Sequence, residues 1–266
     1  MGASMLFLLT GDVQIGKTRW LEKLCGDLAA AGVCVADVIA PGQWVPRAEG
    51  QPGGRHGFDG EGRFEKLGID NALLPQGERI VFARRRDLAE GDQPFAQGEQ
   101  AKAAQLAWAI SDEAIAQVND HFAMLAKMGQ GDCPFVPLSG GGARGRATTG
   151  GASADGDSAG SHPTAGGALT GAVSASEKLA PAIAPGSFLV VDELGRLELL
   201  RGCGLTNAVA LLDAGPTPTF PHALAAVRET LLDQAVSRFA PAWGEPHPIA
   251  PEDEARQLIF NTFGVR

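Results

Sequence analysis

A glycine-rich segment, residues 11–18, constrains the fold of this chain more than any other feature. It reads G-D-V-Q-I-G-K-T and matches the pattern G-x-x-x-x-G-K-[ST]. An apolar run, 5–10, precedes it, and a segment with apolar residues at three- and four-residue spacing, 17–31, follows it. A strand, a tight loop and a helix in this order bind phosphate, because the loop N–H groups and the helix N-terminus both attract anions. We therefore expect a phosphate-binding loop that joins a buried strand to a helix.

Each part of this loop has an expected role. The two glycines allow the backbone to wrap around a phosphate, Lys17 would contact the β- and γ-phosphates, and the Thr18 hydroxyl would bind Mg²⁺. The nucleotide-binding residues predicted from the motif are Gly11, Asp12, Val13, Gln14, Ile15, Gly16, Lys17 and Thr18.

An acidic pair ends a second apolar run, F-L-V-V-D-E at residues 188–193. At such a position we expect Asp192 to reach Mg²⁺, through water, and Glu193 to orient the attacking water and accept its proton. Glu193 and Lys17 are thus the predicted catalytic residues, and Thr18 and Asp192 the predicted metal ligands. The alternative interpretation is that one of the two acids is a helix cap or a surface charge.

Two blocks of the sequence resemble the cancer-related nucleoside-triphosphatase family, a group of small P-loop enzymes first recognised in thermophiles. One is the loop at 11–18, and the other is V-D-E-L-G-R-L-E-L at 191–199, which is similar to the family pattern V-D-E-I-G-x-M-E-L. A shorter match, G-R-H-G-F at 54–58, is similar to a family hairpin. Two features depart from the family: I-A-P-G-Q-W at 39–44 replaces its G-F-x-T-x-E, and a low-complexity insert precedes the acidic strand.

The resemblance implies a RecA-like sheet and Mg²⁺-dependent hydrolysis of ATP, GTP and other nucleoside triphosphates to the diphosphate and phosphate. Arg55, in the hairpin match, and Arg228, which follows an apolar run, are candidates for a cation near the nucleotide. Glu198 belongs to the second block, where a structural role, tying the following helix to the sheet, and a catalytic one are both open.

Alternating strand and helix patterns predict an α/β fold with a mainly parallel sheet. The resemblance implies that this is a P-loop NTPase fold of RecA-like type, with helices on both faces of the sheet. We expect one helix over 99–127, and Trp20 and Trp108 on helical faces in the core. The expected organisation is one discontinuous domain, 1–128 together with 186–242, a flexible insert, 129–185, and a C-terminal tail, 243–266. The insert is expected to be flexible because glycine fills 11 of 33 positions over 139–171.

Composition narrows the function classes. The 266-residue chain carries a formal charge of −9, which argues against a general nucleic-acid binder, since such proteins neutralise phosphates with Lys and Arg. Its apolar runs are shorter than the ~20 residues of a membrane span. The first residues favour a strand over a signal peptide, and the four cysteines have no C-x-x-C spacing. We expect a cytoplasmic protein with reduced thiols and no membrane partner.

The leading hypothesis is therefore a nucleoside-triphosphate phosphohydrolase with Mg²⁺ as its cofactor. A nucleotide-dependent regulator with slow hydrolysis, serving a protein partner in a transport or cofactor-assembly system, stays open. A nucleoside or nucleotide kinase would need an acceptor site and an arginine-bearing lid, and a guanine-specific switch would need an N-K-x-D motif, which the sequence lacks. Base preference, oligomeric state and pathway have no signal in the sequence.

Overall fold

The computed structural model describes residues 3–12, 15–47, 63–86, 98–103, 108–129 and 183–265. All of them belong to one compact unit, and a second unit, Pro134–Leu179, lies outside the described residues. The strands of the described unit are β1 (Met5–Leu9), β2 (Val35–Ile39), β3 (Gly42–Pro46), β4 (Phe64–Leu74), β5 (Glu78–Arg85), β6 (Trp108–Ile110), β7 (Phe188–Leu194), β8 (His222–Val227) and β9 (His247–Ile249).

The described strands form one nine-stranded mixed sheet. Its order is β6-β5-β4-β2-β7-β8-β1-β9. Strand β3 lies off this path and pairs with the first half of β4, from Phe64 to Ile69. Strands β2, β7, β8, β1 and β9 are parallel, whereas every pair that involves β3, β4, β5 or β6 is antiparallel. The α/β class is confirmed, but the expectation of a mainly parallel sheet is wrong, because half of the sheet is an antiparallel extension.

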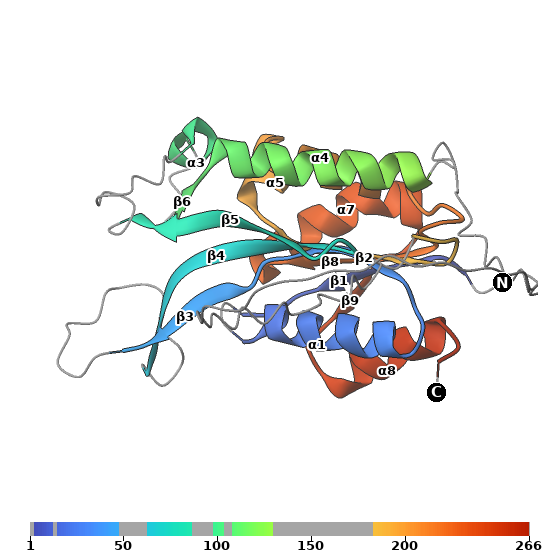
Figure 1. Ribbon diagram of the computed structural model, residues 1–266. Helices are drawn as coiled ribbons and strands as arrows, with labels where there is room; N and C mark the ends of the chain where they lie inside the picture. Colours follow the sequence, from blue (N-terminus) through green and yellow to red (C-terminus); the bar gives the residue numbers. More distant parts are fainter. Residues whose placement is uncertain are drawn as a thin grey trace, which may run out of the picture. The chain divides into compact units, whose positions relative to one another are not determined.

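Helices cover both faces of the sheet (Figure 1). One face carries α4, α5 and α7, and the other carries α1 and α8. The core is split accordingly: Leu6 and Leu8 of β1 pack toward α4, α6 and α7, while Phe7 and Leu9 pack toward α1 and α8. The helical elements are α1 (Lys17–Ala30), α3 (Glu99–Ala103), α4 (Asp112–Gly129), α5 (Arg196–Arg201), α6 (Thr206–Asp213), the 3₁₀ turn Glu229–Leu231, α7 (Leu232–Trp243) and α8 (Asp253–Thr262).

The central parallel strands are apolar along nearly their whole length because both of their faces are covered. In β1 and β8 together, every residue but Met5 is buried. Strand β7 is buried from Phe188 to Asp192. The apolar runs at 5–10 and 188–193 of the sequence correspond to the observed strands β1 and β7.

Strand β4 had no counterpart among the predicted elements. It pairs along one edge with both β2 and β3 and along the other with β5. A short turn at Pro75–Gly77 joins β4 to β5, and Gly77 adopts a left-handed φ of 76°, which suits a residue without a Cβ at the end of such a hairpin loop.

The helix predicted over 99–127 is interrupted. Residues 108–110 form β6, which pairs with Arg85, Arg84 and Ala83 of β5. Helix α4 then begins after Ser111, whose hydroxyl accepts a hydrogen bond from Ala114 N at 3.3 Å. Trp108 therefore lies in a strand and is half-buried, and the expectation that it sits on a helical face is wrong.

The segment 243–266, expected to be a tail outside the domain, contributes to the domain itself. Strand β9 pairs with β1 in parallel, and Thr10 N donates to Ile249 O at 2.9 Å. Helix α8 packs against α1, where Arg256 forms an ion pair with Asp27 at 2.9 Å. The predicted insert, 129–185, lies outside the described residues except at its ends. No helix in the described ranges has the length and apolar character that a membrane span requires.

Candidate functional site

The phosphate-loop motif follows β1 directly, and α1 begins at its lysine. Gly11 and Gly16 have φ values of 133° and 97°, a backbone region that side-chain-bearing residues rarely adopt. The motif therefore needs glycine at both positions for conformational reasons. Ile15 is 47% exposed, and Val13 and Gln14 lie outside the described residues.

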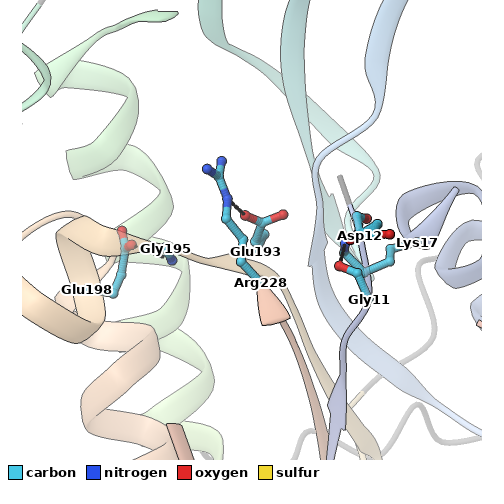
Figure 2. A network of polar contacts seen from close by, with 7 residues as sticks. All are labelled: Gly11, Asp12, Lys17, Glu193, Gly195, Glu198 and Arg228. Atoms are coloured by element: carbon cyan, nitrogen blue, oxygen red, sulfur yellow. Dashed lines mark hydrogen bonds and ion pairs between the residues drawn. The ribbon is translucent and has the colours of Figure 1, made fainter. Parts of the chain in front are cut away.

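Lys17 is held in a folded-back position (Figure 2). Its Nζ donates hydrogen bonds to the carbonyls of Gly11 and Asp12, each at 2.9 Å, and the residue is only 8% exposed. Among the described residues, no carboxylate lies within ion-pair distance of this ammonium. The result is a buried positive charge at the start of a helix, compensated only by backbone carbonyls.

Asp192 lies near the carboxyl end of β7 and is 3% exposed. Its Oδ2 accepts a hydrogen bond from Ala40 N at 3.1 Å, and the Thr18 side chain lies near enough to the carboxylate to lower its pKa. Burial raises the pKa of Asp192 to about 6, although Ala40 N–H and the Thr18 side chain both oppose the shift. The structure thus brings the predicted metal ligands, Thr18 and Asp192, close together.

Glu193 follows Asp192 near the carboxyl end of β7, and its side chain is about one-third exposed. Its Oε1 accepts a hydrogen bond from Arg228 Nε at 2.8 Å (Figure 2). The two residues meet because β7 and β8 are parallel neighbours, so that their carboxyl ends lie together at one edge of the sheet. Glu193, expected to activate water, and Arg228, a candidate cation near the nucleotide, therefore form an ion pair.

Glu198 has a structural role in this arrangement. It is 7% exposed, and its carboxylate accepts hydrogen bonds from Gly195 N at 2.9 Å and Leu205 N at 3.0 Å. These bonds join the first turn of α5 to the start of α6, and burial raises the pKa of Glu198. Figure 2 shows Glu198 well apart from Lys17, with Glu193 between them. Of its two expected roles, the geometry favours the structural one.

Lys66, on β4, was not singled out by the sequence motifs. Its Nζ lies 5.9 Å from the ring centre of Trp44 and 5.5 Å from that of Trp108. Burial lowers the pKa of Lys66, whereas the charges of Asp192 and Glu193 raise it, so the ammonium lies within electrostatic range of the acidic pair. No spacing in the sequence relates Lys66 to Trp44 and Trp108, because each of the three lies on a different strand.

The remaining predictions concern Arg55 and the metal ligands. Arg55 lies outside the described residues. The described residues contain no group of three or more His, Cys, Asp or Glu side chains arranged to hold a metal. The oxygen donors at the site are the Thr18 hydroxyl and the Asp192 carboxylate.

Comparisons with known proteins place no family name on this chain. No protein-family model matches it, and searches of curated proteins and of solved structures gave no significant match.

Proposed function

We propose that this chain is a Mg²⁺-dependent nucleoside-triphosphatase that hydrolyses ATP, GTP and other nucleoside triphosphates to the diphosphate and phosphate. One observation carries the proposal. The Lys17 ammonium is folded back over the loop carbonyls, and the neighbouring Thr18 side chain lies close to the Asp192 carboxylate. A lysine, a hydroxyl and a carboxylate in this relation are the protein groups that phosphoryl transfer requires around a nucleotide.

The order of the parallel strands supports a P-loop fold of RecA-like type for this half of the sheet. The loop follows β1, the acidic pair ends β7, and β8 lies between the two strands. All three strands point the same way, so the loop and the acids meet at their carboxyl edge, where ligands of open α/β sheets bind. The two motif blocks at 11–18 and 191–199 are also consistent with a distant member of the cancer-related nucleoside-triphosphatase family.

The residues present fit a magnesium ion. Mg²⁺ prefers oxygen ligands and is usually held by one or two protein groups together with waters and substrate phosphates. Thr18 and Asp192 would hold it, and the ion would neutralise charge on the phosphate oxygens. The ordinary anionic form of Asp192 is needed for this role, and its pKa of about 6 leaves the carboxylate mostly charged at neutral pH.

The protein groups account for the remaining steps. Lys17 would exchange its two carbonyl partners for phosphate oxygens, and the loop N–H groups would bind the same phosphates. Glu193 would accept a proton from the water whose oxygen forms the new bond to the γ-phosphorus. The bond from this phosphorus to the bridging oxygen then breaks, and the diphosphate leaves with the electron pair.

A second function is favoured by one contact. Because Arg228 engages Glu193 at 2.8 Å, the carboxylate is occupied in this conformation, as in a resting state. This contact suits a nucleotide-dependent regulator whose slow hydrolysis speeds up when a protein partner releases Glu193. A turnover well below about one per second that rises on addition of a partner would favour this function.

Phosphate release from ATP, GTP, CTP and UTP, with and without Mg²⁺, tests the proposal. We expect Lys17→Ala to lose both nucleotide binding and turnover, and Glu193→Gln to keep binding but to turn over roughly 10²–10⁴-fold more slowly. Lys23→Ala and Glu22→Gln, on the exposed side of α1, are the matched controls. Wild-type protein that releases no phosphate, or turnover that survives both site substitutions, would overturn the assignment.

A further inference from the structure

We propose that Lys66 is a further catalytic residue of this site, whose ammonium contacts the γ-phosphate and stabilises the charge that develops there during hydrolysis. The inference rests on the proposed nucleotide hydrolysis. It concerns a residue of the antiparallel extension, outside both sequence motifs.

Lys66 is held between two aromatic rings. Trp44 of β3 and Trp108 of β6 lie 5.9 Å and 5.5 Å from its Nζ, distances at which indole rings attract a cation. Its stem is packed tightly as well, since a Cβ added at Gly42 would lie 2.6 Å from Lys66 Cε and 2.6 Å from Trp44 Nε1. The rings and the close backbone thus fix the direction of the ammonium without neutralising its charge.

This cage is connected to both halves of the nucleotide site. Arg19 lies two positions after Lys17 in the first turn of α1, and its guanidinium is 6.0 Å from the ring centre of Trp44. On the other side, Ala40 N–H bonds to Asp192, and β3 starts only two residues later at Gly42. Short segments therefore link the tryptophan cage to the phosphate loop and to the acidic pair.

Most nearby cations are already engaged by carboxylates. Arg84 and Arg85 of β5 form ion pairs with Asp70 and Glu65 of β4. Arg228 is paired with Glu193. In the described ranges, Lys66 has no carboxylate within ion-pair distance, and its electrostatic partners Asp192 and Glu193 act from farther away. Among the described residues, the Lys66 ammonium is therefore a partly buried charge without an anionic partner at ion-pair distance, and an anion placed beside it would stabilise it.

The γ-phosphate of a bound nucleoside triphosphate would provide this anionic partner. A cation that is partly desolvated and held in place interacts with developing charge more strongly than one in water, because no solvent must reorganise around it. In the reaction, Lys66 keeps its proton and donates hydrogen bonds to γ-phosphate oxygens. The bond changes are those of simple hydrolysis, and no further reactant is required.

Lys66→Met is the decisive substitution, since methionine preserves an unbranched stem between the rings but removes the charge. We expect the turnover number to fall by at least about 100-fold, and the affinity for triphosphate to fall while that for diphosphate changes less than about twofold. Trapping of ADP with aluminium fluoride, which mimics the transferring phosphate, should be lost. Lys66→Arg should retain part of the turnover, and Lys102→Met, on the exposed surface of α3, is the control.

A second measurement covers the case in which Lys66→Met does not fold. In wild-type protein, a lysine-acylating reagent should modify Lys66 less in the presence of Mg²⁺ with a non-hydrolysable triphosphate than with the diphosphate. Equal modification in both, or a folded Lys66→Met protein with wild-type turnover and trapping, would overturn this inference. The outcome is distinct from failure of the proposed function, which is decided by phosphate release from the wild type.

Discussion

Asp37 is an acid buried in the core beside the proposed site. It lies in the middle of β2 with no exposed surface, on the α1 face of the sheet. Neither of its carboxylate oxygens has a well-formed hydrogen bond within the described residues, although the Cys25 thiol and the amide of Leu74 approach it. Burial raises its pKa to about 8, and the charge of Asp192 adds to the shift. Asp37 is therefore mostly protonated at neutral pH.

This protonation makes stability depend on pH. Because the pKa of Asp37 is higher in the folded chain (about 8) than its usual 3.8, its favourable contribution is complete below pH 3.8 and is lost as pH rises through 8. Asp37→Asn mimics the protonated form. We expect its free energy of unfolding to lie closest to that of the wild type below about pH 4, to exceed it progressively as the pH rises to about 8, and to change little relative to it above that pH, measured by denaturant unfolding. Asp120→Asn, on the exposed side of α4, should show no such trend; a pH-independent difference for Asp37→Asn would contradict the prediction.

At the scale of elements, the junction between α5 and α6 depends on a close approach at Gly204. Gly202 and Gly204 both have left-handed φ values, 64° and 76°. A Cβ at Gly202 would meet nothing within 4 Å, whereas a Cβ at Gly204 would lie 2.9 Å from Leu197 Cβ and collide with the Glu198 carboxylate. A side chain at Gly202 would therefore add only backbone strain, whereas one at Gly204 would add backbone strain and steric crowding.

Alanine at these two positions should have unequal effects. We expect Gly202→Ala to lower the free energy of unfolding by about 1–2 kcal/mol, the cost of a left-handed residue. Gly204→Ala should cost about 1–3 kcal/mol more, because it displaces the carboxylate that holds two backbone N–H groups. Denaturant unfolding of both variants measures the difference, and equal losses would show that Glu198 yields without cost.

Elements differed in how well the sequence predicted them. The central strands and α1 have continuous or strictly periodic apolar patterns, because their burial is set locally by a covered sheet. Strand β6 could not be predicted, since Trp108 and Ile110 also fit a helical spacing and only pairing with β5 selects the strand. The same is true of β9, a three-residue strand that contains a proline and is defined by its contact with β1.

The candidate site was predictable where its residues are close in sequence or belong to a motif. The proximity of Thr18 and Asp192 follows from two motifs placed at the ends of parallel strands that lie near each other. The position of Lys66 did not follow from any motif, because its environment is made by Trp44 and Trp108 on two other strands. Such a constellation exists only after the antiparallel extension has formed.

At the scale of the molecule, α8 completes one of the two faces of the core. Ile259 has no exposed surface and packs with β1 and α1 residues, whereas its neighbour Leu258 is 40% exposed. We expect Ile259→Ala to lower the free energy of unfolding by about 2–5 kcal/mol, through lost burial and a cavity. Leu258→Ala should cost less than about 1 kcal/mol. A thermal or denaturant melt distinguishes them, and similar small losses would mean that α8 is not part of the cooperative unit.

The position of β1 in the sheet has a consequence for biosynthesis. Its only neighbours in the described sheet are β8 and β9, and Met5 pairs with His222, which is 217 residues away. At about 5–20 residues per second, the ribosome needs roughly 10–40 s between these two positions. During that interval the emerging apolar strand has no partner to pair with, and a chaperone could bind it. The proposed nucleotide site, which follows β1, would therefore be complete only when translation is nearly finished.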